Sequence, residues 1–183
     1  MIRRFLRLFR KQINLKTFKS VGMNVQISED CSFSEPEQME IGNNVYIGPG
    51  GLFQAGGGLE IGSGTIIAHK IDILTKNHNY DGDGLKAIPY DGTYIARKVV
   101  IGENVWIGSN VCIVPGVTIG EGSVIGMGSV VIRDVPAYAV IGGNPAKVLK
   151  YRNKEKYEKL KSQHNIYLKL KSQGEIKFSL IRK

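Results

Sequence analysis

The stretch LTKNHNYDGDG, residues 74–84, holds the histidine best placed to do chemistry. His78 is one of three histidines in 183 residues, and it stands where a regular pattern of Ile-Gly pairs gives way to irregular residues, 79–98. A histidine with its ordinary pKa of about 6.5 can accept and return a proton at neutral pH. Long irregular loops in a compact domain are often functional. We predict that His78 is a general base on an outward corner at the root of a protruding loop; the plain alternative is a solvent-facing corner histidine.

A histidine base works best when a partner holds its second ring nitrogen. Asp81 follows His78 by three residues and Asn77 precedes it, so both are candidates for orienting the ring or contacting a substrate. Asp81 precedes a glycine, however, and Asp-Gly is an ordinary turn pair, so a backbone carbonyl is an equal candidate. His69 is expected on the surface and His164 in a basic tail.

The cysteines and histidines do not form the pattern of a metal site. Cys31 and Cys112 lie far apart, and no Cys/His spacing resembles that of zinc ligands. Two cysteines also give no disulfide framework, which favours a reducing, cytoplasmic setting. No apolar run approaches the roughly 20 residues of a membrane span, and the first residues lack the apolar region of a signal peptide. We therefore expect a cytoplasmic protein without a metal.

A repeat of six residues organises the chain. From residue 101 it runs IGENVW, IGSNVC, IVPGVT, IGEGSV, IGMGSV, VIRDVP, and earlier sets begin at residues 21, 41 and 61. Three hexads form a unit, which steps by 20 residues early and by 18 later. This spacing predicts a triangular solenoid of short parallel strands. The first and fifth residues of each hexad should point inward, and Gly at the second place should allow the chain to turn.

The charge is divided unevenly along the chain. The formal net charge of +9 divides into +16 for residues 1–20 and 147–183 and −7 for residues 21–146, since 9 − 16 = −7. The body is therefore acidic, which argues against nucleic acid as a partner. Arg133, Lys147 and Lys150 place cations near the end of this acidic body, where an anionic cofactor would need them, although they could also be ordinary solvated side chains. Trp106, expected to point outward, suggests a ligand or subunit contact.

The hexads, together with KNH at 76–78 and KVVIGENVWIG at 98–108, resemble the hexapeptide-repeat acyltransferases. The resemblance covers about residues 21–150 and implies a left-handed parallel β-helix that assembles as a homotrimer with active sites between subunits. The segment from Val105 to Lys150 is similar to the C-terminal part of the sugar and xenobiotic acetyltransferases, especially the galactoside and maltose enzymes. Carried over by position, contacts to acetyl-CoA fall on Trp106, Ser109, Met127, Ile132, Arg133, Lys147 and Lys150.

The chain departs from the family at several of these positions. Met127 stands where Ala is frequent, Ile132-Arg133 where Thr-Lys is common, and Lys147 and Lys150 where Arg is common. The lysines keep the positive charge for CoA phosphates but lose bidentate geometry. If the threonine contributes a hydroxyl, Ile132 cannot replace it.

The resemblance implies acetyl transfer from acetyl-CoA to a hydroxyl of a sugar or polysaccharide precursor, with His78 as the base. N-acetylation of an amino sugar stays open, as does a scaffold without catalysis. A zinc hydrase on the same solenoid would need three histidine ligands, and only His69 and His78 lie on the body.

The two ends are expected to be helical additions. Residues 1–20 form a basic amphipathic segment whose stripe Ile2, Phe5, Leu6, Phe9 and Ile13 could cap the solenoid, or touch an anionic membrane surface through residues 1–13 at the inner membrane face. Residues 21–150 form the β-helix domain with its loop at 79–98, and residues 151–183 form a basic helical tail. Within the tail, RNKEKYEKLKSQ predicts a lysine-rich helix and the remainder is expected to be loosely ordered.

Overall fold

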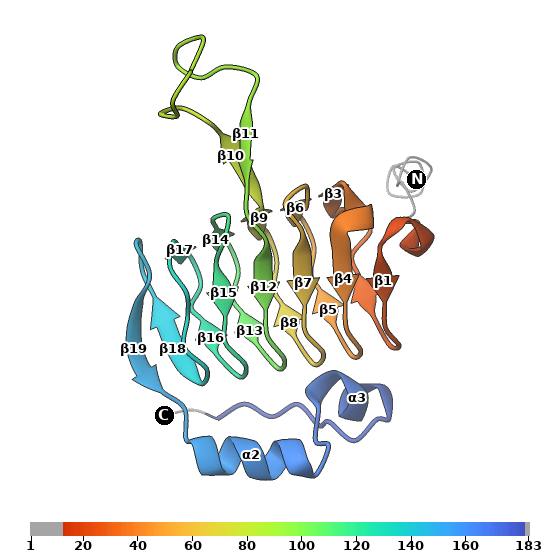
Figure 1. Ribbon diagram of the computed structural model, residues 1–183. Helices are drawn as coiled ribbons and strands as arrows, with labels where there is room; N and C mark the ends of the chain where they lie inside the picture. Colours follow the sequence, from red (N-terminus) through yellow and green to blue (C-terminus); the bar gives the residue numbers. More distant parts are fainter. Residues whose placement is uncertain (1–12, 182–183) are drawn as a thin grey trace, which may run out of the picture.

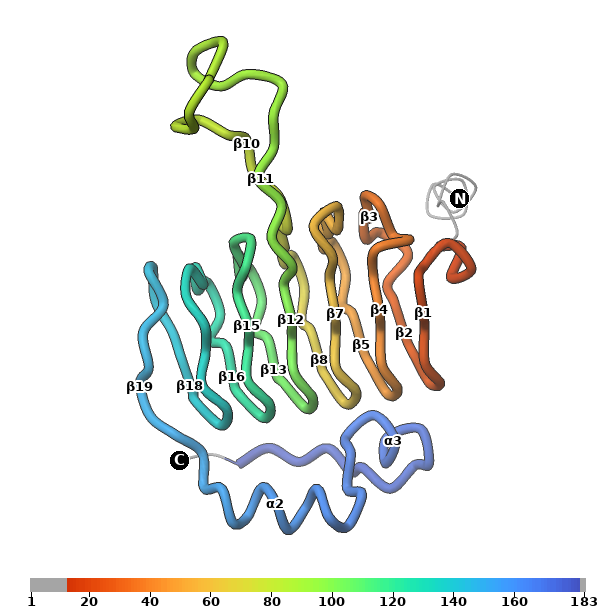
Figure 2. Tube along the Cα trace, in the orientation of Figure 1, coloured from red at the N-terminus to blue at the C-terminus, as the bar shows by residue number. Residues whose placement is uncertain are grey.

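The computed structural model describes residues 13–181, which form a parallel β-solenoid of about six turns (Figures 1 and 2). The predicted amphipathic segment lies outside the described residues except for its end, where Ile13 packs against the core. The predicted fold, a left-handed β-helix of hexapeptide repeats, is confirmed. None of the helices in the described range is long and apolar enough to span a bilayer.

Three faces make up the solenoid, and nearly all neighbouring strands on each face are parallel. The first face contains β1 (Ser20–Val21), β4 (Met39–Ile41), β7 (Leu59–Ile61), β12 (Val99–Ile101) and β15 (Thr118–Ile119). The second face contains β2 (Gln26–Ile27), β5 (Tyr46–Ile47), β8 (Ile66–Ile67), β13 (Trp106–Ile107), β16 (Val124–Ile125), β18 (Ala139–Gly142) and β19 (Lys147–Tyr151), the last antiparallel to β18. The third face contains β3 (Ser32–Ser34), β6 (Leu52–Gln54), β9 (Asp72–Leu74), β14 (Cys112–Ile113) and β17 (Val130–Val131). Two short 3-10 helices, η2 (Leu15–Thr17) and η3 (Pro36–Gln38), belong to the first turns.

The core is the stack of residues predicted to point inward. The isoleucines that open successive hexads are each at most 1% exposed, namely Ile101, Ile107, Ile113, Ile119 and Ile125. Val105 and Val111, at the fifth place of their hexads, are also buried. Each such side chain stabilises the fold by roughly 1.5–3 kcal/mol relative to leaving it exposed.

The glycines have a different role from the one predicted. Those at the second place of a hexad do not supply the turn; they allow adjacent turns to approach closely, since a Cβ on Gly62 would lie 2.5 Å from the carbonyl carbon of Gly102. Positive φ angles recur instead at the fourth place of many hexads, for example 54° at Asn104 and 90° at Gly116. Asn and Gly are the residues that adopt this backbone conformation most readily.

The protruding segment begins earlier than predicted. The chain leaves the solenoid after β9, so His78 is not on a corner but already lies in β10 (Lys76–His78), which pairs antiparallel with β11 (Tyr94–Ala96). This hairpin, with its connecting loop, stands away from the solenoid, and the chain returns to the first face at β12 (Figure 1). The antiparallel pairing gives backbone hydrogen bonds to residues that have left the repeat.

The C-terminal residues form a strap along the edge opposite the hairpin (Figure 2). The predicted lysine-rich helix is α2 (Lys154–Ser162), and a second helix, α3 (Tyr167–Ser172), follows where loose order was expected. Tyr157 of α2 is buried; its hydroxyl accepts a hydrogen bond from Asn104 Nδ2 at 3.0 Å and donates one to Glu121 Oε1 at 2.9 Å. Burial raises the pKa of Tyr157 well above its ordinary value. The strap is therefore packed onto the solenoid, and Leu168 of α3 is 1% exposed.

Candidate active site

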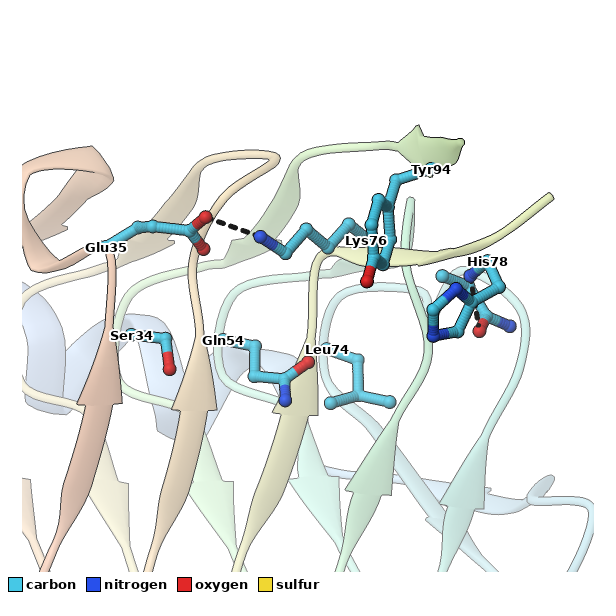
Figure 3. A pocket seen from close by; sticks show the side chains of 8 residues that line it. Ser34, Glu35, Gln54, Leu74, Lys76, His78 and Tyr94 are labelled. Atoms are coloured by element: carbon cyan, nitrogen blue, oxygen red, sulfur yellow. Dashed lines mark hydrogen bonds and ion pairs between the residues drawn. The ribbon is translucent and has the colours of Figure 1, made fainter. Parts of the chain in front are cut away.

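A cavity of about 470 Å³ opens at the base of the hairpin. Its floor is a row of side chains in register on three adjacent strands: Ser34 pairs with Gln54, and Gln54 pairs with Leu74. Figure 3 shows this row below the hairpin residues. The cavity is lined by Ser34, Glu35, Gln54, Leu74, Lys76, Asn77, His78 and Tyr94. The predicted base thus lines a mainly polar cavity rather than standing alone in solvent.

Aromatic rings hold the imidazole of His78. Its ring centroid lies 3.7 Å from that of Tyr90, with an interplanar angle of 20°, and 4.5 Å from that of Tyr94. Nδ1 of His78 is buried and has no hydrogen-bond partner within residues 13–181. Stacking restricts the orientation of the ring while leaving this nitrogen free for a proton donor or acceptor.

The two orienting residues considered from sequence do not hold the imidazole. Asn77 Oδ1 accepts a hydrogen bond from the backbone N–H of His78 at 2.9 Å, and its side chain is exposed. Asp81 is exposed in the hairpin loop. Asn77 therefore binds the backbone of His78, and Asp81 faces solvent.

An ion pair closes the other side of the cavity. Lys76 Nζ donates a hydrogen bond to Glu35 Oε1, across 41 positions of sequence. The same ammonium lies 5.5 Å from the ring centroid of Tyr94. Since Tyr94 also contacts His78, these contacts link Glu35 to the imidazole.

The hairpin loop is ordered around Asp91. Its Oδ1 accepts hydrogen bonds from Thr93 Oγ1 at 2.6 Å and from Thr93 N at 2.8 Å, and Oδ2 accepts one from Lys86 N at 3.2 Å. The Thr93 hydroxyl, and then the two backbone donors, hold the pKa of Asp91 below its ordinary value. This turn directly follows Tyr90 and so helps to place the ring that stacks on His78.

Part of the predicted cofactor set shares one row of the second face. Register pairs run from Trp106 to Val124, then Val140, then Lys150, and both ends of this row are exposed. At a strand spacing of about 4.8 Å, the two ends are about 14 Å apart. Lys147, also in β19, is exposed on the same face. Trp106 and the two lysines therefore lie along one surface.

The remaining cofactor candidates lie at the corners. Ser109 and Met127 occupy the same corner in successive turns, where Gly128 N donates to Ser109 O at 2.9 Å. Ile132 and Arg133 follow β17 on the third face and are exposed. The structure thus places the seven residues on one face and two corners rather than in one pocket of a single chain.

Sequence reasoning missed Glu35, Lys76, Gln54, Tyr90 and Tyr94. The sequence did hold a signal for Glu35, Lys76 and Gln54. The early turns step by 20 residues, so residues 34, 54 and 74 stack on one another and bring their sequence neighbours close together. The two tyrosines gave no such signal, because their contact with His78 depends on the hairpin.

Within the described range, no three His, Cys, Asp or Glu side chains are grouped so that they could bind a metal ion.

A family model and a related enzyme both match this chain. The family model for bacterial transferase hexapeptide (six repeats) matches residues 98–133. A dTDP-4-amino-4,6-dideoxy-D-glucose acyltransferase from Escherichia coli is 35% identical over 173 residues, covering 80% of this chain and 90% of the relative.

Two solved structures share the fold. A maltose O-acetyltransferase from Clostridium difficile 630 is 30% identical with a TM-score of 0.70, covering 83% of this chain and 84% of that chain. A hexapeptide-repeat acetyltransferase from Vibrio cholerae O1 biovar eltor, complexed with acetyl-CoA, is also 30% identical with a TM-score of 0.70, covering 75% and 73%. The fold and these relatives define an acyltransferase built on a β-solenoid. The chain belongs to the hexapeptide-repeat transferase family, which confirms the resemblance seen in its sequence.

Proposed function

We propose that the protein transfers an acetyl group from acetyl-CoA to a hydroxyl of a sugar or polysaccharide precursor, with His78 as the general base. The observation that carries the proposal is the imidazole of His78, which lines a polar cavity, stacks on Tyr90 and contacts Tyr94, with Nδ1 unpaired within residues 13–181. The related Vibrio structure, complexed with acetyl-CoA, supports the choice of donor.

His78 would move one proton during the transfer. It accepts the proton of the acceptor hydroxyl as that oxygen attacks the thioester carbonyl; the new C–O bond forms, the C–S bond breaks, and the proton passes to the departing CoA sulfur. No acyl-enzyme is needed, because holding both substrates in line lowers the barrier. Backbone N–H groups or hydroxyls near the carbonyl oxygen would stabilise its developing charge.

The E. coli relative favours a second acceptor, an amine. That protein is named for an amino sugar, whereas the Clostridium relative is a maltose O-acetyltransferase. The same base would serve either nucleophile, so acceptors of both kinds belong in the test.

We further infer that the working enzyme is a homotrimer whose active sites lie between subunits. Ile88, Tyr80 and Tyr94 of the hairpin are 91%, 67% and 55% exposed, which is unusual for large apolar side chains on one short segment. Trp106 is 56% exposed on the second face, away from the corner where the hairpin leaves. A neighbouring subunit could bring these surfaces together.

The test is release of free thiol from acetyl-CoA in the presence of maltose, methyl galactosides and dTDP-4-amino-4,6-dideoxy-D-glucose. We expect acceptor-dependent release by the wild type, and a loss of about 10²–10⁴-fold in kcat for His78→Ala. His164→Ala removes an exposed histidine of the C-terminal strap and should leave kcat unchanged.

Acetyl-CoA binding, measured by calorimetry, separates loss of chemistry from loss of binding. His78→Ala should bind acetyl-CoA as the wild type does. Wild-type protein that does not bind acetyl-CoA would contradict the transferase function, and full activity in His78→Ala would contradict the role of the base.

A further inference from the structure

Glu35 has an unusual backbone for its residue type. Its φ and ψ of 57° and 51° lie in the left-handed region, which a glutamate rarely adopts. The equivalent residues of the next two turns, Ala55 and Thr75, are buried. A glutamate in that orientation would place its charge inside the solenoid, which is costly. The left-handed turn instead directs the carboxylate toward the cavity, as Figure 3 shows.

Only one oxygen of the Glu35 carboxylate has a hydrogen-bond partner among the described residues. Oε1 accepts the hydrogen bond from Lys76, whereas Oε2 is buried and has no partner within residues 13–181. Gly56 provides the space for it, because a Cβ at that position would lie 2.5 Å from Oε2. Glu35 lines the cavity, and a buried carboxylate oxygen without a donor there indicates that a ligand supplies one.

We propose that Glu35 and Lys76 bind adjacent hydroxyls of a pyranose acceptor. This inference rests on the proposed acetyl transfer. Oε2 of Glu35 accepts a hydrogen bond from one hydroxyl, and the Lys76 ammonium donates one to the oxygen beside it. The pair neutralises its own charge, so it favours a neutral diol over an anion. Contacts through Tyr94 link the pair to His78, which places the diol next to the group that is acetylated.

The choice of acceptor then depends on Glu35. An acceptor that lacks the hydroxyl bound by Oε2 leaves a buried carboxylate oxygen unpaired, and sites built in this way reject such analogues strongly. The same diol can flank either a reacting hydroxyl or a reacting amine, so the inference holds for both nucleophiles.

The test measures sugar binding separately from turnover. The full-length protein, saturated with CoA, is titrated with methyl α-D-glucopyranoside and its 2-, 3-, 4- and 6-deoxy forms, and the dissociation constants are followed by saturation-transfer NMR. We expect one deoxy form to bind the wild type about tenfold more weakly than the parent sugar. Glu35→Gln should bind the parent about tenfold more weakly and should no longer distinguish that deoxy form.

Two further variants separate recognition from a structural role. Glu37→Gln changes an exposed carboxylate in the adjoining 3-10 helix and should behave as the wild type. Gly56→Ala keeps every charge but displaces Oε2, so it should reproduce the loss of discrimination seen in Glu35→Gln. If the ion pair served only to anchor the hairpin, Glu35→Gln would lower the melting temperature and leave the ranking of the deoxy sugars intact.

The outcomes distinguish this inference from the proposed function. Unchanged discrimination in Glu35→Gln, or no sugar binding by the wild type, would overturn the role of the pair. Sugar binding that depends on Glu35, but without any thiol release, would leave the pair as a sugar site and refute the transferase.

Discussion

At the scale of single residues, the orientation of His78 rests on two aromatic rings rather than on a carboxylate. Tyr90 stacks on the imidazole at 3.7 Å, and an aromatic pair of this kind is worth about 0.5–1.5 kcal/mol. Tyr90→Ala removes the stack, so we expect kcat to fall by about 2–10-fold. Steady-state kinetics with the best acceptor measure this, and KM for acetyl-CoA should not change.

Two tyrosine variants serve as controls for this prediction. Tyr90→Phe keeps the ring and should retain wild-type kcat. Tyr167→Ala removes an exposed tyrosine of the C-terminal strap and should also be neutral, because its ring makes none of the aromatic contacts found around His78. A loss in Tyr90→Phe equal to that in Tyr90→Ala would assign the effect to the hydroxyl.

The same residues show what a sequence can predict about a site. His78 could be picked out because its type and its place at the end of a repeat are both visible locally. For Glu35 the 20-residue step of the repeat shows only its place beside the stacked residues 34, 54 and 74. Its contact with Lys76, which spans 41 positions, cannot be predicted from that step. Its left-handed backbone is equally invisible, because glutamate has no preference for that region.

At the scale of elements, the hexad depends on a close approach between turns that only glycine permits. Gly62→Ala places a Cβ 2.5 Å from the backbone of Gly102, and backbone cannot move aside as a flexible side chain can. We expect the free energy of unfolding to fall by about 1–3 kcal/mol, as for other overpacked sites. Urea denaturation followed by circular dichroism measures the change.

The control for this variant comes from the hairpin. Gly92→Ala meets no atom within 4 Å and should leave the unfolding midpoint unchanged. Equal stability of the two variants would show that the turns can separate at little cost and that the second-place glycines are not constrained by packing.

The inward isoleucines and the departure from the repeat differ in how well they could be predicted. Residues such as Ile107 and Ile113 are fixed by alternation within a strand, which a sequence displays directly. The sequence pattern predicts the start of the hairpin three residues late, because the residues of β10 also complete the hexad 73–78. Residues 76–78 belong to the hairpin because they pair with residues 94–96 of β11, a contact that the hexad pattern does not reveal.

At the scale of the whole molecule, one chain does not bring the predicted base and the predicted cofactor surface together. His78 lies on the hairpin, which leaves the solenoid between the third and first faces, whereas Trp106 and Lys150 share a row on the second face. A second copy of the chain packed against the hairpin would bury the exposed hairpin residues. It would also supply a cofactor surface beside His78. The positions of these surfaces support the proposed trimer.

This arrangement predicts complementation between inactive variants. His78→Ala and Trp106→Ala should each show little activity, the first through loss of the base and the second through weak acetyl-CoA binding. If each site takes His78 from one subunit and Trp106 from its neighbour, every trimer that contains both variants has one intact site, so purified mixed trimers recover about a third of the sites. Co-expression with two different tags, followed by tandem purification and thiol-release assays, measures this. Mixed trimers without recovered activity would place both residues in a site within one subunit.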